Sequence, residues 1–312
     1  MVAVVSAPTN LGLRPPVPGG VPGAAKAPEA LREAGLHRLL HARGAVDGGV
    51  VLPGRYVDDD GRRAAGTVRN QAAIIDHASR LAHRLFEIRE SGQAPLVLGG
   101  DCSLLIGAGL ATRVSGGGGL VHIDGHTDFR HPGNSDGVGS VAGEDLAAAV
   151  GAHSPALSDI DGLSPYFAPA RTAHIGCRYG DPHEEELRRT IALVAPADEV
   201  ILHGGVRAAS RVRAVDGLES GYWIQVDVDV LDPSHMPAVD SPDPGGLSPG
   251  ELIGLLAALA PHAWGASVTV FDPDLDPDGV HARTVAGIVA EGLADLGAEI
   301  GDDAPISAPG AR

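Results

Sequence analysis

The chain has 312 residues, of which 23 are Lys or Arg and 40 are Asp or Glu, so its formal net charge is −17. Lys26 is the single lysine and the arginines are scattered, which excludes a basic surface for phosphates and argues against a nucleic-acid partner. Hydrophobic residues make up 44% and aromatic residues 3%, and a core of Val, Leu, Ile and Ala is typical of parallel sheets covered by helices.

Short apolar runs alternate along the chain with longer amphipathic segments, which predicts strands and helices in turn. The expected strands are residues 2–6, 95–98, 120–123, 172–175, 200–203, 222–226 and 266–271. The expected helices are residues 28–43, 70–90, 103–113, 144–150, 184–190, 249–260 and 280–296. This alternation indicates βαβ units and an α/β fold.

We expect one domain over residues 1–297, because no sharp change of composition marks a boundary. Residues 44–69 are predicted to form an irregular excursion, since the segment mixes Gly, Asp and Arg without a period, and residues 298–312 a disordered tail. The lack of a long apolar stretch and of a signal peptide predicts a cytoplasmic protein with no membrane partner.

Three segments that follow predicted strands carry acidic side chains. They read Gly99-Gly100-Asp101-Cys102-Ser103, Asp124-Gly125-His126-Thr127-Asp128 and Asp227-Val228-Asp229-Val230-Leu231-Asp232-Pro233. Alternate residues of an extended segment point to one side, so Asp124, His126 and Asp128 can converge. The same holds for Asp227 and Asp229. Ligands of open α/β sheets bind beyond the carboxyl ends of the strands, which makes this edge the candidate site.

Four carboxylates at the end of a buried sheet repel one another and lose hydration, so a cation has to lie among them. Carboxylates with one imidazole suit two divalent ions, Mn²⁺ above all. Aspartates after strands also cap helices or close turns, and for Asp101 or Asp232 alone we accept that interpretation. Two independent clusters at strand ends favour the metal site. We interpret His122, in the strand before the first cluster, as structural.

These motifs give the chain a resemblance to the ureohydrolases, the family of arginases, agmatinases and formiminoglutamases. The D-x-H-x-D and D-x-D-x-x-D-P patterns carry the resemblance, which extends over essentially the whole chain. It implies a three-layer α/β fold with a central, mostly parallel eight-stranded sheet, a binuclear manganese centre, and a homo-oligomer, either a trimer or a hexamer. It further implies Asp124 and Asp227 as bridging ligands, Asp128 as a ligand of the first ion, and His126 and Asp229 as ligands of the second.

One residue departs from the family pattern at the metal site. Where the family has Asp-His-Ser after the Gly-Gly turn, with the histidine as a ligand of the first ion, this chain has Cys102. Its place at a predicted helix N-terminus favours a thiolate, and a buried structural cysteine is the alternative. Thiolate is a soft ligand and poorly matched to Mn²⁺, so we expect the first site to be weakened or altered.

Substrate-binding positions also differ from the family. Ala142 stands where the family has a proton-shuttle histidine, and Asp272 where it has a guanidinium-binding glutamate. Asp181 matches an aspartate that holds the substrate α-ammonium in arginases, which favours an α-amino acid substrate, while a plain turn residue is an equal alternative. By the same resemblance, Asn134 and Ser135 are expected to contact the α-carboxylate.

The resemblance implies a hydrolase of a small guanidino substrate. Family members with Gly-Gly-Asp-Cys resemble the amidinohydrolases of secondary metabolism, so we expect Nω-hydroxy-L-arginine or arginine to be converted to ornithine with hydroxyurea or urea. A metal-bound water of lowered pKa would attack the guanidino carbon. We expect Asp128 to pass its proton to the leaving amine, and Asp272 to orient the substrate. The alternatives are an agmatine, guanidino-acid or formimino hydrolase, and a catalytically inactive metal- or ligand-binding homologue.

Overall fold

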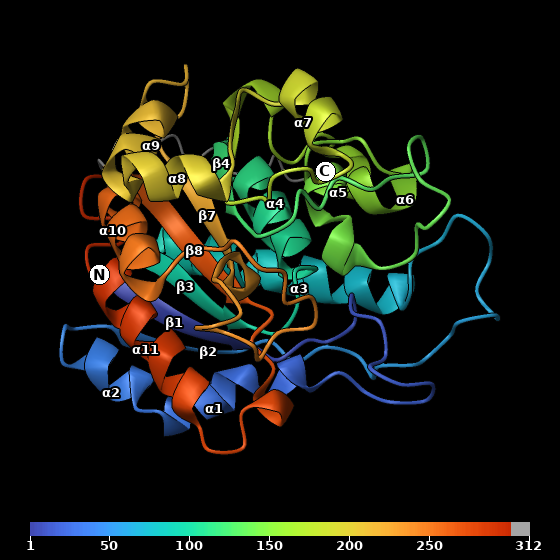
Figure 1. The fold of residues 1–312 in the computed structure, drawn as a ribbon, viewed down its shortest axis with the longest axis horizontal. Helices are drawn as coiled ribbons and strands as arrows, with labels where there is room; N and C mark the ends of the chain where they lie inside the picture. The colour runs from blue at the N-terminus through green and yellow to red at the C-terminus, as the bar shows by residue number, and fades with distance from the viewer. Residues whose placement is uncertain (301–312) are drawn as a thin grey trace.

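The chain folds around one parallel sheet. The computed structural model describes residues 1–300, and within them eight strands pair in the order β2-β1-β3-β8-β7-β4-β5-β6 (Figure 1). They are β1 (Val2–Ala7), β2 (Val46–Val50), β3 (Ala94–Gly99), β4 (Gly119–Ile123), β5 (Thr172–Ile175), β6 (Leu193–Ala195), β7 (Tyr222–Asp227) and β8 (Ala263–Thr269). Every pair of neighbours is parallel, which confirms the predicted fold class.

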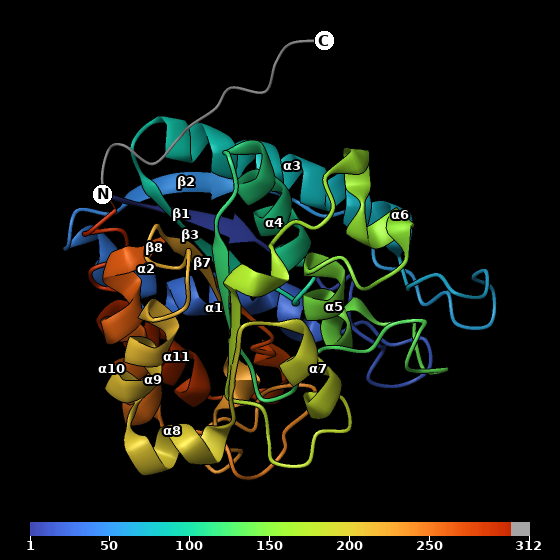
Figure 2. The ribbon, with the colours of Figure 1, turned by 90° about the horizontal axis from the view of Figure 1, so that it is seen from above.

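Helices lie on both faces of the sheet and complete the three layers (Figure 2). They are α1 (Ala27–Glu33), α2 (Leu36–His41), α3 (Gln71–Glu90), α4 (Leu104–Val114), α5 (Asp145–Ala149), α6 (Pro155–Ser158), α7 (Glu184–Thr190), α8 (Ala197–His203), α9 (Gly205–Arg213), α10 (Pro249–Leu259) and α11 (Val280–Gly292). One face packs against α3, α4 and α5, and the other against α1, α2 and α8 to α11. No helix within residues 1–300 has the length and apolar character needed to cross a membrane.

The core is aliphatic and lies between these layers. All residues of β3, β4 and β7 are buried, as expected of parallel strands that are covered on both faces. The helix α10 shows how local sequence fixes an element boundary. Its N-cap Ser248 accepts the N–H of Glu251 at 3.3 Å, and the Glu251 carboxylate accepts the N–H of Ser248 at 2.7 Å, so two N–H groups that the helix leaves free are satisfied.

Several elements differ from the expectation. Residues 200–203, expected as a strand, end the helix α8, in which Asp198 and Glu199 occupy the first turn and face the positive end of the helix dipole. The short strand β6 pairs with β5 instead. The helix expected over residues 28–43 is divided at Gly35, whose φ of 90° lies in the left-handed region. The helices α6 and α9 were not expected.

The excursion expected at residues 44–69 contains a strand, so that expectation is wrong for β2. Its sequence Val-Asp-Gly-Gly-Val lacks the apolar run of a buried strand, because β2 is an edge strand paired with β1 alone. Of the tail expected at residues 298–312, the Glu299 N–H donates to the Pro261 carbonyl at 2.8 Å. Residues 301–312 lie outside the described part of the chain.

The sheet order brings the acidic segments together. The strands β3, β8, β7 and β4 are consecutive neighbours in the middle of the sheet, and the acidic segments follow β3, β4 and β7. Because parallel strands end at the same edge, the three segments meet beyond the carboxyl ends of the central strands, where α/β sheets hold ligands.

Candidate metal centre

The loop after β4 turns sharply so that its acidic residues face inward. Oδ1 of Asp124 accepts the N–H of His126 at 2.7 Å, which curls the chain back over the end of the strand. Asp128 has a φ of 46°, in the left-handed region that non-glycine residues rarely adopt. Its carbonyl accepts the N–H of Ala147 at 3.2 Å, which links the loop to α5. Such strain is typical of residues that a functional site holds in place.

The loop after β7 is bonded to the first loop. Oδ1 of Asp227 accepts the N–H of Asp229 at 2.9 Å and closes the one-turn 3₁₀ helix Val228–Val230. Oδ1 of Asp229 accepts the N–H of Gly125 at 3.0 Å, and its Oδ2 lies 2.9 Å from Nδ1 of His126. The two acidic loops therefore hold each other in register.

His126 lies between two carboxylates. Its Nε2 is 3.2 Å from Oδ2 of Asp243, on the side opposite Asp229. Burial by itself lowers the pKa of His126, but the hydrogen bond and negative charge of Asp229, followed by those of Asp243, raise it to about 9. In the absence of another cation, a protonated His126 imidazole would therefore partly neutralise this cluster of carboxylates.

The turn after β3 brings Cys102 to the same point. Asp101 is buried and accepts hydrogen bonds from the Thr9 hydroxyl at 3.1 Å and the Gly12 N–H at 3.2 Å. It therefore fixes the turn, in agreement with its structural interpretation. Sγ of Cys102 donates to Oδ2 of Asp227 at 2.9 Å. Burial, and then the charge of Asp227, raises the pKa of the Cys102 thiol well above its usual value.

The structure brings together all six side chains expected as ligands. Their donor atoms form overlapping groups of three in which the atoms lie within 4.8 Å of one another, and these groups include Cys102, Asp124, His126, Asp128, Asp227 and Asp229. Burial and mutual repulsion raise the pKa of Asp124, Asp128 and Asp227. Oδ2 of Asp124 has no hydrogen-bond partner within residues 1–300. A buried oxygen left without a partner among carboxylates fits a divalent cation, and the oxygen-rich donor set suits Mn²⁺.

A cavity of about 310 Å³ opens over the cluster. Besides the acidic cluster, its wall carries charged and titratable side chains that can reach a small ligand: Arg14, Arg130, Asp181, His183 and Asp240. The cavity is large enough for a small polar molecule and joins a cation-binding floor to a wall with both signs of charge.

Comparison with known proteins places this architecture in a family. The model of the arginase family matches residues 2–294. The chain belongs to the arginase family. It is 29% identical to an arginase of Brevibacillus brevis over 86% of this chain and 91% of that protein. It is 30% identical to a formimidoylglutamase of Halobacterium salinarum over 86% and 82%. The arginase structure from Bacillus caldovelox superposes with a TM-score of 0.83 at 26% identity, over 94% of this chain and 97% of that one.

Membership in the arginase family makes the chain a hydrolase that acts on amidino carbon–nitrogen bonds. The arginase and the formimidoylglutamase are about equally identical to it, so overall identity does not select the substrate. That choice depends on the side chains around the cavity.

Two expected substrate contacts of this arginase-family chain lie away from the cavity wall. Oδ1 of Asn134 accepts the His131 N–H, and its amide nitrogen donates to Oε2 of Glu186 at 2.8 Å. The Ser135 hydroxyl accepts the N–H of Gly137 at 3.0 Å. Neither side chain lines the cavity. Both instead stabilise the loop, whose register sequence reasoning could not fix.

Asp272 also lies outside the cavity lining. One of its carboxylate oxygens accepts the N–H of Gly23 at 3.1 Å and the other that of Asp274 at 2.9 Å, so the residue joins the turn after β8 to the segment before α1. The expectation that it orients the substrate is therefore not supported by its position. Ala142 does line the cavity, as the resemblance implies, and contributes only a methyl group there.

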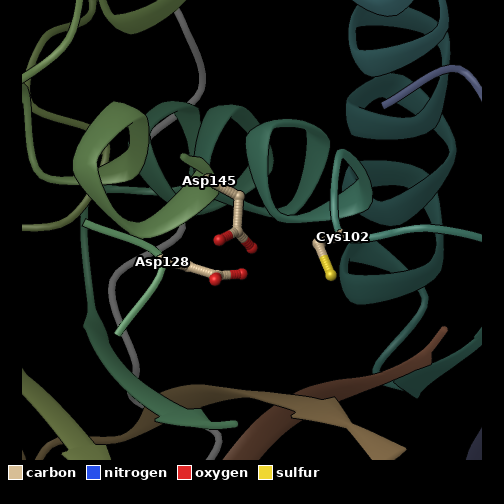
Figure 3. Close-up of side chains that lie close together, drawn as sticks. All are labelled: Cys102, Asp128 and Asp145. Atoms are coloured by element: carbon tan, nitrogen blue, oxygen red, sulfur yellow. The ribbon is translucent and has the colours of Figure 1, made fainter. Parts of the chain in front are cut away.

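Sequence reasoning did not single out Asp145, and it interpreted His122 as structural. Asp145 begins α5, and an aspartate at a helix start reads as a cap. In the structure its donor atoms group with those of Cys102 and Asp128 (Figure 3). His122, interpreted as structural, places Nε2 3.8 Å from Oδ2 of Asp124. His122 is two residues before Asp124, so the alternation of side chains along a strand could have placed it on the same face of the sheet as Asp124. No pattern in the neighbouring sequence indicated Asp145.

Proposed function

We propose that this arginase-family enzyme hydrolyses the guanidino C–N bond of an arginine-like amino acid, Nω-hydroxy-L-arginine or arginine, to ornithine and hydroxyurea or urea. The observation that carries the proposal is the joint lining of one cavity by the acidic cluster, Asp181 and Arg130. Such a wall complements a substrate with a cationic reacting end and a zwitterionic tail. We further propose that the enzyme is cytoplasmic and forms a homo-oligomer, a trimer or hexamer.

We propose that the acidic cluster holds two Mn²⁺ ions. Asp124 and Asp227 would bridge them, with Asp128 and Cys102 on the side of the first ion and His126 and Asp229 on the side of the second. The support is a buried donor set that is rich in hard oxygen ligands and lacks enough positive charge of its own. Divalent ions supply a water of lowered pKa and polarise the bond to be broken.

Asp128 is placed to move the proton of the reaction. It lines the cavity and its carboxyl pKa is raised by burial and by the neighbouring carboxylates, Asp145 first among them. A carboxylate of raised pKa accepts a proton more readily than an ordinary aspartate. We propose that Asp128 takes the proton of the attacking water and delivers it to the leaving amine. Ala142 offers no such group.

The tail of the substrate would be held by opposite charges. Asp181 accepts the N–H of Thr127 at 3.1 Å and its hydroxyl at 2.8 Å, which fixes the carboxylate beside the metal loop, where it can meet an α-ammonium group. The Arg130 guanidinium lies against Gly143, where a Cβ would overlap it. Glycine therefore leaves room for a cation that can pair with an α-carboxylate.

A panel of substrates tests the proposal. The Mn²⁺-loaded enzyme is incubated with Nω-hydroxy-L-arginine, L-arginine, agmatine, a guanidino acid and formimino-glutamate, with the chelated protein as control. We expect the highest kcat/KM for one of the first two. Preference for agmatine would contradict a role for Arg130, because agmatine lacks the carboxylate.

A guanidino-acid or formimino hydrolase is the second candidate, favoured by Arg130 in the cavity wall and by the identity to a formimidoylglutamase. This candidate predicts turnover of the guanidino acid and of formimino-glutamate. It also predicts that substitution of Asp181 leaves kcat and KM nearly unchanged. If the protein binds metal but hydrolyses none of the compounds, the result would support the remaining alternative, a catalytically inactive metal-binding homologue.

A further inference from the structure

Asp145 is a buried carboxylate that faces the metal centre from outside the acidic loops. It is fully buried, and Cys102 and Asp128 are also buried, at 1% and 7% exposure. The three side chains come from separate elements, namely α5, the turn before α4 and the loop after β4, and they converge on one space (Figure 3). One donor atom of each lies within 4.8 Å of the other two.

The loop before α5 holds Asp145 in this position through its neighbour. Oε1 of Glu144 accepts the N–H groups of Gly139 and Ser140 at 2.7 and 2.9 Å, and its Oε2 lies 2.9 Å from Nε2 of His153. Glu144 thus points away from the site and is satisfied there. These bonds fix the backbone next to Asp145. The side chain of Asp145 is therefore held in a position that faces the metal centre.

One oxygen of Asp145 has no partner. Oδ1 accepts the N–H of Leu146 at 2.7 Å, whereas Oδ2 has no hydrogen-bond partner among residues 1–300. A buried carboxylate oxygen left unpaired is strongly unfavourable unless a cation meets it. Nε2 of His122 lies 3.6 Å from this oxygen, beyond hydrogen-bond distance, and has no hydrogen-bond partner itself among residues 1–300.

We propose that Asp145 is a ligand of the first divalent ion, on the side where Cys102 replaces the family histidine. Sulfur is a poor partner for Mn²⁺, and a carboxylate oxygen is a good one, so a chain with Cys102 gains a hard ligand from α5 at the place where it has lost imidazole. The inference rests on the metal centre of the proposed function and goes beyond it, because Asp145 is not among the residues that the resemblance implies.

Metal binding to Asp145→Asn tests the inference without reference to turnover. Metal-free wild type and variant are titrated with Mn²⁺, and bound metal is measured by elemental analysis and calorimetry. We expect the bound metal to fall from about two ions per chain to about one, or affinity for the first ion to fall by more than about 100-fold, because losing a mere outer-shell partner costs about 10- to 100-fold. Two ions bound with a smaller loss would overturn the proposal and leave Asp145 as a positioning residue for His122.

Asp240→Asn is the matched control. It removes the same charge from the wall of the same cavity, but Asp240 belongs to no metal group among residues 1–300. We expect it to keep the wild-type number of ions. An equal loss in both variants would show that charge alone matters and would contradict ligation by Asp145.

The double variant Cys102→His/Asp145→Asn guards against misfolding. Histidine returns the family donor to the first site, so it should restore the second equivalent of metal that Asp145→Asn loses. A folded double variant, judged by circular dichroism, that still binds one ion would contradict the proposal. The substrate panel is independent of these titrations: metal loss in Asp145→Asn without turnover by wild type would retain the inference and reject the proposed function.

Discussion

Sγ of Cys102 lies 2.9 Å from Oδ2 of Asp227, and both side chains are buried beyond the carboxyl ends of β3 and β7, which flank β8 in the sheet. Burial and the surrounding carboxylates raise the pKa of the thiol, so without a metal ion Cys102 is protonated and donates to Asp227. A cation at this point has to displace that proton before sulfur can bind it. The contact therefore explains why the first site should differ from the one with histidine.

Replacing this cysteine by the family residue should strengthen the first site. Imidazole is a better ligand for Mn²⁺ than a protonated thiol, so we expect Cys102→His to bind the first ion at least about tenfold more tightly. Calorimetric titration with Mn²⁺ measures this affinity. Cys102→Ser serves as the control, since a hydroxyl adds no imidazole. Unchanged affinity in Cys102→His would show that the residue does not face the ion.

Metal removal should make stability depend on pH in a definite direction. Burial, followed by neighbouring carboxylates, raises the pKa of Asp124 and Asp128. A carboxyl group with a raised folded-state pKa stabilises the fold while it is protonated, and this contribution is lost as pH rises from the unfolded value near 4 through the folded one. The Tm of the chelated protein should thus fall as the pH is raised above about 5.

Saturating Mn²⁺ should reverse that trend, because the ions replace the protons and bind the ionised carboxylates better at high pH. Thermal melts with and without chelator at several pH values measure both effects. A chelated protein whose Tm stays level or rises over this range would contradict the buried, cation-dependent cluster.

Arg130→Gln should impair substrates that carry a carboxylate. Losing a charge-assisted hydrogen bond costs about 1.5–3 kcal/mol, so KM for Nω-hydroxy-L-arginine should rise by about 10- to 100-fold. Any activity on agmatine should be unaffected. Arg14→Gln is the matched control, because Arg14 lines the same cavity but donates to the Gly137 carbonyl at 3.3 Å. Equal effects of the two variants on KM would argue against Arg130 as the carboxylate contact.

Asp181→Asn should separate the α-amino acids from the other substrates. The amide oxygen can still accept from the Thr127 hydroxyl, whereas the amide nitrogen cannot accept the Thr127 N–H, so one of the two bonds is kept while the charge is lost. We expect KM for arginine-like substrates to rise by about tenfold or more, with kcat changed less. A silent substitution would favour the guanidino-acid or formimino reading, in which Asp181 is a turn residue.

The strand ends and the acidic clusters were predictable because both depend on local patterns. Apolar runs locate β3, β4 and β7, and the acidic residues that follow them mark the site, although Asp124 and Asp128 converge through a turn and not through the expected extended segment. Prediction failed where a pattern fits two structures. The apolar run Val200-Ile201-Leu202 fits either a strand or a helix turn, and in the structure it belongs to the helix α8, which begins before it with Asp198 and Glu199 in the first turn.

Positions set by tertiary contacts could not be derived locally. Asp272 follows β8 and matches a family position by spacing, yet its carboxylate meets Gly23, which is distant in sequence. Asp145, by contrast, was not expected at the site and lies there. Its orientation depends on Glu144, His153 and the backbone of Asp128. A single sequence does not show which loop residue another loop will meet.

Product formation by the wild-type enzyme tests the central claim most directly. Nω-hydroxy-L-arginine is incubated with the Mn²⁺-loaded protein, with chelated protein and with Asp124→Asn, and ornithine and hydroxyurea are quantified. Hydrolysis of one guanidino C–N bond predicts the two products in equal amounts, with the Mn²⁺-loaded protein only. No ornithine above the chelated control from hydroxyarginine or arginine would contradict the account.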